Sequence, residues 1–314
     1  MYERFYGLAE LPFELTSNPR FLLLTPKHRE VLSNLQHGMA TRKGVTLVIG
    51  EAGTGKTTLI RAAVRRENSA TTQYALLNNP TLTRDEFMEF LAFTYQLPPD
   101  SAKSKPVFLR ELDRKLRDNL ARGIVSPLII DEAQSLSHEL LEEVRLLANM
   151  ETDDAKLLPI TLAGQPELAT RLNEMPLRQL KQRVCLRCDL APLDIRETAA
   201  YISTRIKVAG GDPAQIFTRE AVMAVFHYSR GIPRVISVVC DNAMISGFAA
   251  GVRPVTDQIV NEVSKDFDLA RGATFTPTFT FETPQSAPTE QEPETEGPAK
   301  RPRFMKGALA WLLP

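Results

Sequence analysis

The sequence predicts an α/β fold, in which a doubly wound parallel sheet is followed by a small all-helical domain. Three observations lead to this prediction. Short apolar segments alternate with amphipathic ones, each apolar segment is hydrophobic throughout rather than at every second residue, and the segments end just before Pro192. Strands covered by helices on both faces need this continuous apolar pattern, and such strands belong to parallel sheets.

The apolar segments are the expected strands. In chain order they are Val45–Ile49, Tyr74–Leu77, Val125–Ile130, Leu158–Ala163 and Val184–Leu190. Each is short and bounded by turn-forming residues, which favours a buried strand over a helix. The sequence therefore predicts one sheet with helices between its strands.

Helix ends are marked between these strands. Thr83 and Glu86 have the spacing of a capping box, so a helix is expected to begin there. Pro106 suits the first turn of the next helix and Gly123 its end. Ser137 stands at the N-cap position of a further helix with one apolar face.

Beyond Pro192 the strands stop and helical patterns follow. The expected helices are Ile195–Val208, Arg219–Tyr228, Pro233–Ala249 and Asp257–Phe267. Thr218 and Thr256 stand where the N-caps of two of them belong. We therefore expect a sheet domain over residues 1–191 and a small helical domain over residues 192–269.

The composition changes after Ala270, where Thr, Pro, Glu, Gln and Ser dominate. Such a segment has too few apolar side chains to form a core, which predicts a disordered linker over residues 270–303. Residues 304–314 form a short apolar tail that contains Trp311 and follows a basic cluster. The tail is too short to span a bilayer. It could lie on an anionic membrane surface, dock on a partner protein or stay unstructured.

Composition narrows the function classes. The 314 residues include 38 basic and 38 acidic side chains, so net charge gives no global reason to expect tight nucleic-acid binding. Cys185 and Cys188 form a CxxC inside a strand pattern, and with Cys240 they are too few for a disulfide framework. The CxxC spacing could indicate zinc or redox chemistry, but no second pair follows, so we expect Cys185 and Cys188 to be buried for structural reasons. A signal peptide and an apolar stretch of about 18 residues are both missing, which predicts a cytoplasmic protein.

A phosphate-binding loop follows the first expected strand. The run from Gly50 to Thr57 matches G-x-x-x-x-G-K-[ST], between a strand and a helix expected over Thr57–Arg66. Backbone N–H groups of such a loop hold phosphates, Lys56 neutralises them and Thr57 binds Mg²⁺. The alternative is a plain glycine-rich turn. The expected ATP-binding residues are Gly50, Glu51, Ala52, Gly53, Thr54, Gly55, Lys56, Thr57 and Thr58.

Two carboxylates follow the third expected strand. Asp131 and Glu132 stand at its carboxyl end, where α/β sheets place their ligands. Asp131 would hold Mg²⁺ through water, and Glu132 would orient and deprotonate the attacking water. The alternative is that both residues only cap the following helix.

Arginines and amides complete the set of candidates. Phosphoryl transfer develops negative charge, which Arg178 or Arg183 before the last strand, or Arg234 in the helical region, could stabilise. Gln165, after the fourth strand, could hydrogen-bond the γ-phosphate or water, and Asn78 could restrain Glu132. The alternatives are solvated helix charges for the arginines and an ordinary loop residue for Gln165.

These motifs together resemble an AAA+ ATPase over about residues 1–268. More narrowly, two stretches resemble the ExeA/GspA family of general secretion pathway ATPases. They are the N-terminal pattern of Tyr2, Phe5-Tyr6-Gly7-Leu8, Pro12-Phe13, Pro19, Phe21 and His28, and the run Gly164-Gln165-Pro166-Glu167-Leu168. Exosortase-associated ATPases are similar.

The resemblance implies a role for each matching residue. Lys56 and Thr57 would be Walker A, Asp131 and Glu132 Walker B, Gln165 sensor 1 and Arg234 sensor 2. Arg183 would be an arginine finger given to a neighbouring subunit, which implies a homo-oligomer. The N-terminal segment and the His28 region would flank the adenine, although the aromatic residues Tyr2, Phe5 and Phe13 could equally be structural anchors.

Three functions remain open on the sequence. The first is an ATP-driven factor, cytoplasmic or at the inner face of the cell membrane, that assembles or regulates an envelope secretion, export or exopolysaccharide system through a protein partner. The second is a DNA-associated regulator of transposition, similar to TnsC, that assembles on duplex DNA. The third is a nucleotide switch with negligible turnover, which the intact Glu132 disfavours.

Overall fold

The computed structural model describes residues 2–15, 19–66, 71–78 and 80–267 of the chain, and these fall in one compact unit, Met1–Ala273. The predicted linker over residues 270–303 and the predicted tail over residues 304–314 lie outside the described residues. None of the helices in the described part of the chain is long and apolar enough to cross a membrane.

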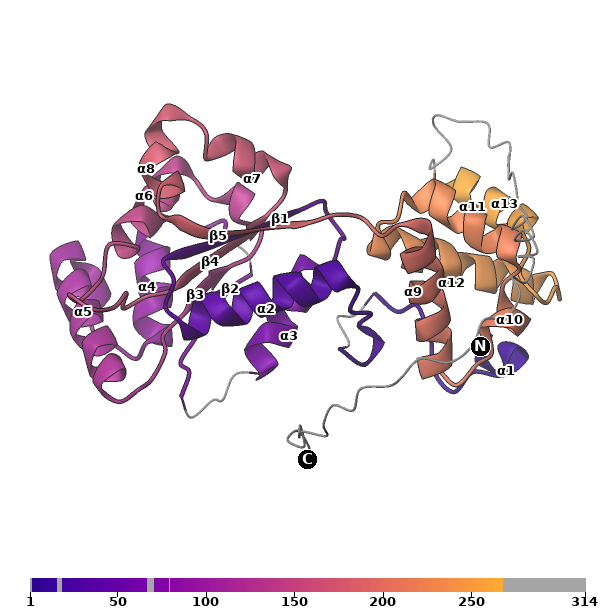
Figure 1. The fold of residues 1–314 in the computed structure, drawn as a ribbon, viewed down its shortest axis with the longest axis horizontal. Coiled ribbons are helices and arrows are strands. Elements are labelled where there is room, and N and C mark those ends of the chain that lie inside the picture. Colours follow the sequence, from indigo (N-terminus) through magenta and orange to yellow (C-terminus); the bar gives the residue numbers. More distant parts are fainter. Residues whose placement is uncertain (1, 16–18, 67–70, 79, 268–314) are drawn as a thin grey trace, which may run out of the picture. The chain divides into compact units, whose positions relative to one another are not determined.

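Within the described residues, five strands form one parallel sheet in the order β2-β3-β4-β1-β5 (Figure 1). They are β1 (Val45–Gly50), β2 (Ala75–Leu77), β3 (Leu128–Ile130), β4 (Ile160–Gly164) and β5 (Val184–Leu190). The predicted strands are confirmed, with ends that shift by a few residues. The third strand is shorter than expected because Pro127 has no N–H for the ladder, so that Val125 forms only an isolated bridge with Thr72.

Helices cover both faces of the sheet. Val48 of β1 packs in a hydrophobic cluster with α2 (Pro26–Ala40) and α3 (Lys56–Arg66). Its neighbours Leu47 and Ile49 pack in a second cluster with α4 (Arg84–Thr94), α5 (Lys105–Ala121) and α6 (His138–Leu147). Figure 1 shows α2 and α3 side by side on one face. This is the doubly wound arrangement that the continuous apolar strands predict. Two further helices of the sheet region are α7 (Pro166–Arg171) and α8 (Arg178–Lys181).

Predicted helix ends agree with the structure. The Thr83–Glu86 capping box opens α4, and the Ser137 side chain accepts a hydrogen bond from the backbone N–H of Leu140 at the start of α6. Gly123 follows the end of α5 in a left-handed conformation, φ +72°, which glycine adopts at little cost. Local capping chemistry therefore sets these boundaries.

Strand β5 corrects the expectation for the cysteines. Cys188 is buried, as expected, but Cys185 is exposed. β5 lies at the edge of the sheet and has only one well-covered face, so its exposed and buried side chains alternate. The CxxC spacing thus places its two thiols on opposite faces of a strand.

The helical region consists of α9 (Ile195–Val208), α10 (Pro213–Ile216), α11 (Arg219–Ser229), α12 (Pro233–Ala249) and α13 (Asp257–Asp266). Thr218 caps α11 as predicted, by accepting a hydrogen bond from the backbone N–H of Ala221. Thr256 occupies the N-cap position of α13, but its side chain makes no capping hydrogen bond. The all-helical character predicted beyond Pro192 is confirmed.

The N-terminal segment shares the hydrophobic core of these helices. Its buried aromatic residues Tyr2, Tyr6 and Phe13 belong to the same cluster as the apolar residues of α9–α13. The backbone N–H of Ala9 also donates to the carbonyl of Ala209 at 2.8 Å. The predicted boundaries at residues 191 and 269 stay predictions, and the aromatic residues serve as structural anchors.

Candidate nucleotide-binding site

The loop between β1 and α3 favours glycine at three positions, two because of their backbone conformation and one because of a close contact. Gly53 and Gly55 have φ values of +82° and +100°. A Cβ on Gly50 would lie 2.8 Å from the carbonyl oxygen of Leu190 on β5. Because α3 begins at Lys56, its unpaired backbone N–H groups open onto the loop, as anion binding requires.

Lys56 is folded into this loop. Its side chain is buried, and Nζ donates to the carbonyl oxygens of Gly50 at 2.8 Å and Glu51 at 3.1 Å. Burial lowers the pKa of the ammonium group, while the carboxylates of Glu132 and Asp131 act in the opposite direction. The loop thus holds a cation that is poorly solvated and therefore suited to a phosphate ligand.

Thr57 and Asp131 lie in contact beside the loop. Oγ1 of Thr57 donates to Oδ2 of Asp131 at 2.5 Å, and the backbone N–H of Glu132 donates to Oδ1 at 2.9 Å. Asp131 is buried at the carboxyl end of β3. A hydroxyl and a carboxylate oxygen at one point are the ligands that Mg²⁺ prefers, so these residues fit that ion.

Glu132 is held by two glutamines. Its backbone is left-handed, with φ +52°, and its Oε2 accepts from Nε2 of Gln134 at 2.6 Å and from Nε2 of Gln165 at 3.3 Å. Asn78 is exposed and donates no hydrogen bond to Glu132 among the described residues. Gln134 was not among the residues that the sequence singled out, since a glutamine two positions after a carboxylate has no recognisable pattern of its own.

Arg234 meets the loop from the helical region. The backbone N–H of Arg234 donates to the carbonyl of Gly53 at 3.2 Å. Its side chain is exposed and lines a polar cavity together with Lys56, Thr57 and Glu132. The structure therefore brings Arg234 to the same cavity as Lys56, although Arg234 lies 178 positions after Lys56 in the chain (234 − 56).

Arg183 lies at the other end of the sheet. Its carbonyl accepts from the N–H of Val45, the first residue of β1, whereas the phosphate loop leaves the last residue of that strand. A strand of this length spans about 17 to 20 Å, so Arg183 is remote from the loop of its own chain. Arg178, at the start of α8, is likewise exposed. The structure does not unite either arginine with Lys56.

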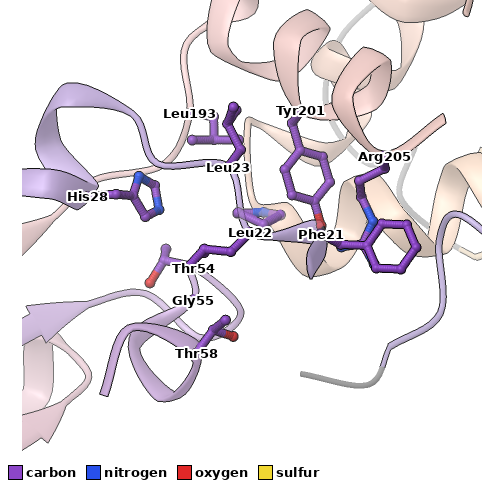
Figure 2. Close-up of a pocket in the computed structure, with 11 residues that line it drawn as sticks. Phe21, Leu22, Leu23, His28, Thr54, Gly55, Thr58, Leu193, Tyr201 and Arg205 are labelled. Carbon is purple, nitrogen blue, oxygen red and sulfur yellow. Dashed lines mark hydrogen bonds between the residues drawn. The ribbon is translucent and has the colours of Figure 1, made fainter. Parts of the chain in front are cut away.

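An apolar pocket adjoins the phosphate loop (Figure 2). Thr54 and Gly55 of the loop and Thr58 of α3 line one part, and His28 lies beside Thr54. The remaining walls come from Phe21, Leu22, Leu23, Leu193, Tyr201, Arg205 and Pro233. A pocket with apolar walls next to an anion-binding loop suits a flat heteroaromatic base joined to phosphates.

His28 links α2 to this pocket. Its Nδ1 lies 2.7 Å from Oγ1 of Thr25, the N-cap of α2. Burial lowers the pKa of the imidazole, against smaller opposing effects of Glu197 and of a backbone hydrogen bond with Thr54. The resemblance predicts that the His28 region flanks the adenine. The structure places His28 and Phe21 at the pocket, and their contact with adenine stays a prediction.

Tyr201 and Arg205 form the opposite wall, and the sequence did not single them out. Nη1 of Arg205 donates to the hydroxyl of Tyr201 at 2.6 Å, and Nε donates to the carbonyl of Pro12 at 2.5 Å. The guanidinium also lies over the ring of Phe21, 5.0 Å from its centroid. On the sequence these residues read only as positions in an amphipathic helix, so nothing marked them.

Comparisons with known proteins agree with this geometry. Residues 39–172 match a protein-family model described as an AAA domain. General secretion pathway protein A of Aeromonas hydrophila is 40% identical over 251 residues, which cover 80% of this chain and 46% of that protein. The chain therefore spans about half the length of the curated relative that it matches.

Solved structures show the same fold. Cdc6p from Pyrobaculum aerophilum is similar with a TM-score of 0.63 and 17% identity, over 81% of this chain and 72% of that one. The ORC2 protein of Aeropyrum pernix, solved in ADPNP–ADP complexes, is similar with a TM-score of 0.56 and 17% identity, over 79% and 71%. At these identities the likeness concerns the fold alone.

Proposed function

The chain is an AAA-domain protein of the general secretion pathway protein A type, and from this premise we propose that it binds ATP with Mg²⁺ and hydrolyses ATP to ADP and phosphate. One observation supports the proposal above all. A buried lysine, a Thr57–Asp131 pair and a Glu132 carboxylate meet beside a glycine-rich loop at a helix N-terminus. That set of groups is suited to phosphoryl transfer.

Binding would use the loop and the apolar pocket. The backbone N–H groups from Gly50 to Thr58 would hold the phosphates, and Lys56 would exchange its bonds to carbonyl oxygens for bonds to phosphate oxygens. Thr57, with Asp131 acting through water, would hold Mg²⁺. Bound Mg²⁺ neutralises charge that develops between the β- and γ-phosphates.

Hydrolysis would begin at Glu132. Its carboxylate would accept a proton from a water molecule as the water oxygen forms a bond to the γ-phosphorus. The bond from that phosphorus to the oxygen bridging to the β-phosphate would break, and ADP would leave with the electron pair. Gln165 and Arg234 would donate hydrogen bonds to the γ-phosphate, in keeping with their places at Glu132 and at the polar cavity.

The site calls for a second copy of the chain. Arg183 is exposed at the end of the sheet opposite the phosphate loop, so it can reach a γ-phosphate only across an interface between copies. A head-to-tail interface of this kind generates rings or filaments. We therefore place a homo-oligomer, with Arg183 as the finger given in trans, in the proposed function.

In the cell, ATP turnover would assemble or regulate an envelope secretion, export or exopolysaccharide system through a protein partner. The support is the 40% identity to General secretion pathway protein A. We place the protein in the cytoplasm, peripherally at the inner face of the membrane through residues 304–314. The alternative, a DNA-associated regulator similar to TnsC, is not favoured, because the likeness to the ORC2 and Cdc6p structures, at 17% identity, concerns the fold alone.

One comparison tests the proposal. ATP turnover and assembly mass are measured with anionic liposomes and with duplex DNA, for the wild type and for Lys56→Ala and Glu132→Gln. We expect the wild type to hydrolyse ATP and both variants to lose this activity. We also expect anionic liposomes, rather than duplex DNA, to stimulate the turnover of the wild type. Unchanged turnover in Lys56→Ala would overturn the ATPase assignment, and strong stimulation by DNA would overturn the export role.

A further inference from the structure

Gln134 connects the ends of two strands at the candidate site. Its Nε2 donates to Oε2 of Glu132, after β3, at 2.6 Å, and its Oε1 accepts from the backbone N–H of Gln165, after β4, at 3.1 Å. A carboxylate only accepts and a backbone N–H only donates, so these partners fix which end of the amide is which. Both ends of the Gln134 amide are therefore occupied.

The backbone that carries Gln134 is held firmly. Arg171 Nη1 donates to the carbonyl oxygens of Gln134 at 2.6 Å and Leu136 at 2.8 Å. Ala133 beside it is fully buried. A Cβ on Gly164 would lie 2.9 Å from Oε1 of Gln134, so the glycine leaves the room that the amide occupies. The short helix η3 (Ala133–Ser135) thus presents the amide from a fixed position.

The two oxygens of Glu132 differ as a result. Oε2 accepts from both Gln134 and Gln165, which uses the two lone pairs of that oxygen. Oε1 accepts no hydrogen bond from the described residues. The carboxylate is therefore fixed in its plane, with one oxygen left to accept a proton.

The two glutamines are not equivalent. Gln165 bonds Glu132 at 3.3 Å. Under the proposed function, its amide would turn from Glu132 toward the γ-phosphate when ATP binds. Gln134 bonds Glu132 more closely, at 2.6 Å, from a firmly held backbone. Once Gln165 turns away, Gln134 is the amide that still orients the base.

From these contacts we infer that Gln134 is a positioning residue, which orients the Glu132 carboxylate toward the attacking water and couples that orientation to the loop that carries Gln165. The inference rests on the proposed hydrolysis of ATP. Gln134 touches no reacting atom and acts through Glu132. Misplacing a catalytic group by about 1 Å lowers a rate by up to about 100-fold, which sets the scale of the effect.

The test is Gln134→Met, which keeps the volume of the side chain and removes both hydrogen bonds. We expect kcat to fall about 10- to 100-fold while the KM for ATP stays within about twofold. In the Glu132→Gln background the same change has no further effect, because the residue that Gln134 orients is already disabled. The matched control is Gln215→Met, at an exposed glutamine of α10.

Gln134→Glu is the second variant and decides the matter if Gln134→Met does not fold. It keeps the length of the side chain but places a second carboxylate against Glu132, so kcat falls at least as far. A wild-type kcat in either folded variant, a loss that appears in KM instead, or an additive loss in Glu132→Gln overturns the inference. Absence of ATP turnover in the wild type removes the proposed function itself, which is a distinguishable result.

Discussion

Thr57 donates its hydroxyl hydrogen to Asp131, with Oγ1 and Oδ2 2.5 Å apart. The residues are 74 positions apart in the chain. They meet because Thr57 lies in the first turn of α3, directly after the loop that follows β1, while Asp131 follows β3 at the same edge of the sheet. This contact marks the place where we expect Mg²⁺ to bind.

The hydroxyl of Thr57 is therefore predicted to be essential and its methyl group dispensable. Thr57→Val removes the oxygen at constant shape, and we expect Mg²⁺-dependent ATP turnover to fall at least about 100-fold, whereas Thr57→Ser keeps most of it. The measurement is turnover as a function of Mg²⁺ concentration. Thr170→Val, at an exposed threonine of α7, is the control. Equal activity of Thr57→Val and wild type would remove Thr57 from the ion site.

Gly53 is predicted to be irreplaceable for two separate reasons. Its φ is +82°, and a Cβ would lie 2.8 Å from Cβ of Arg234. Gly123 shares the left-handed backbone, φ +72°, but faces open space. Gly123→Ala should cost about 1 to 2 kcal/mol of unfolding free energy from strain alone. Gly53→Ala should cost more and weaken ATP binding at least about tenfold.

Urea unfolding and ATP-analogue titration of both glycine variants give the comparison. The difference between them isolates the contact between the phosphate loop and α12. If Gly53→Ala binds nucleotide as tightly as Gly123→Ala, then the approach of Arg234 to the loop has no part in binding.

His28 predicts a specific dependence of stability on pH. Burial holds the pKa of the folded-state imidazole below its usual value of 6.5. Between the folded pKa and 6.5 the unfolded chain binds more protons than the folded one, so stability falls as pH falls through this window. His28→Asn should lose less stability than the wild type between about pH 7 and pH 5. The measurement is the unfolding free energy of both proteins at each pH.

The informative quantity is the difference between the two proteins in the slope of unfolding free energy against pH. The carboxylates titrate in both proteins and contribute equally to both slopes. Parallel curves would mean that the imidazole titrates equally in both states. The predicted result would show that the folded protein binds a proton at His28 less readily than the unfolded chain does.

Arg183 is predicted to act on a neighbouring copy. Arg183→Ala and Lys56→Ala should each be nearly inactive alone, because a finger contributes about 10³- to 10⁵-fold to turnover. Mixed in equal amounts, they should recover about a quarter of wild-type turnover, from interfaces that pair an intact loop with an intact arginine.

The same mixing with Arg178→Ala in place of Arg183→Ala decides between the two arginines. If Arg178→Ala is inactive by itself and its mixture with Lys56→Ala recovers turnover, whereas the mixture with Arg183→Ala does not, the role passes to Arg178. Full activity of an isolated Arg183→Ala protein would show that Arg183 is not the trans arginine.

Much of the fold could be predicted because its signals are local. The phosphate loop, the capping box at Thr83 and the continuous apolar strands each depend on neighbours within a few residues. The expectation for Cys185 was wrong although a local signal was present. Cys185, Arg187 and Asp189 alternate with Leu186, Cys188 and Leu190, and this period of two is typical of a strand with one exposed face.

The sequence by itself determined that a glycine-rich loop, a lysine and two carboxylates stand at the ends of strands, since these positions follow from periodicity and spacing. Only the tertiary structure decided that Gln134 rather than Asn78 holds Glu132, that the N-terminal aromatic residues pack with α9–α13, and that Arg234 touches Gly53. The physical reason is that parallel strands joined by long crossovers bring distant segments to one edge of the sheet. Which side chains then meet depends on packing between elements, which no local pattern records.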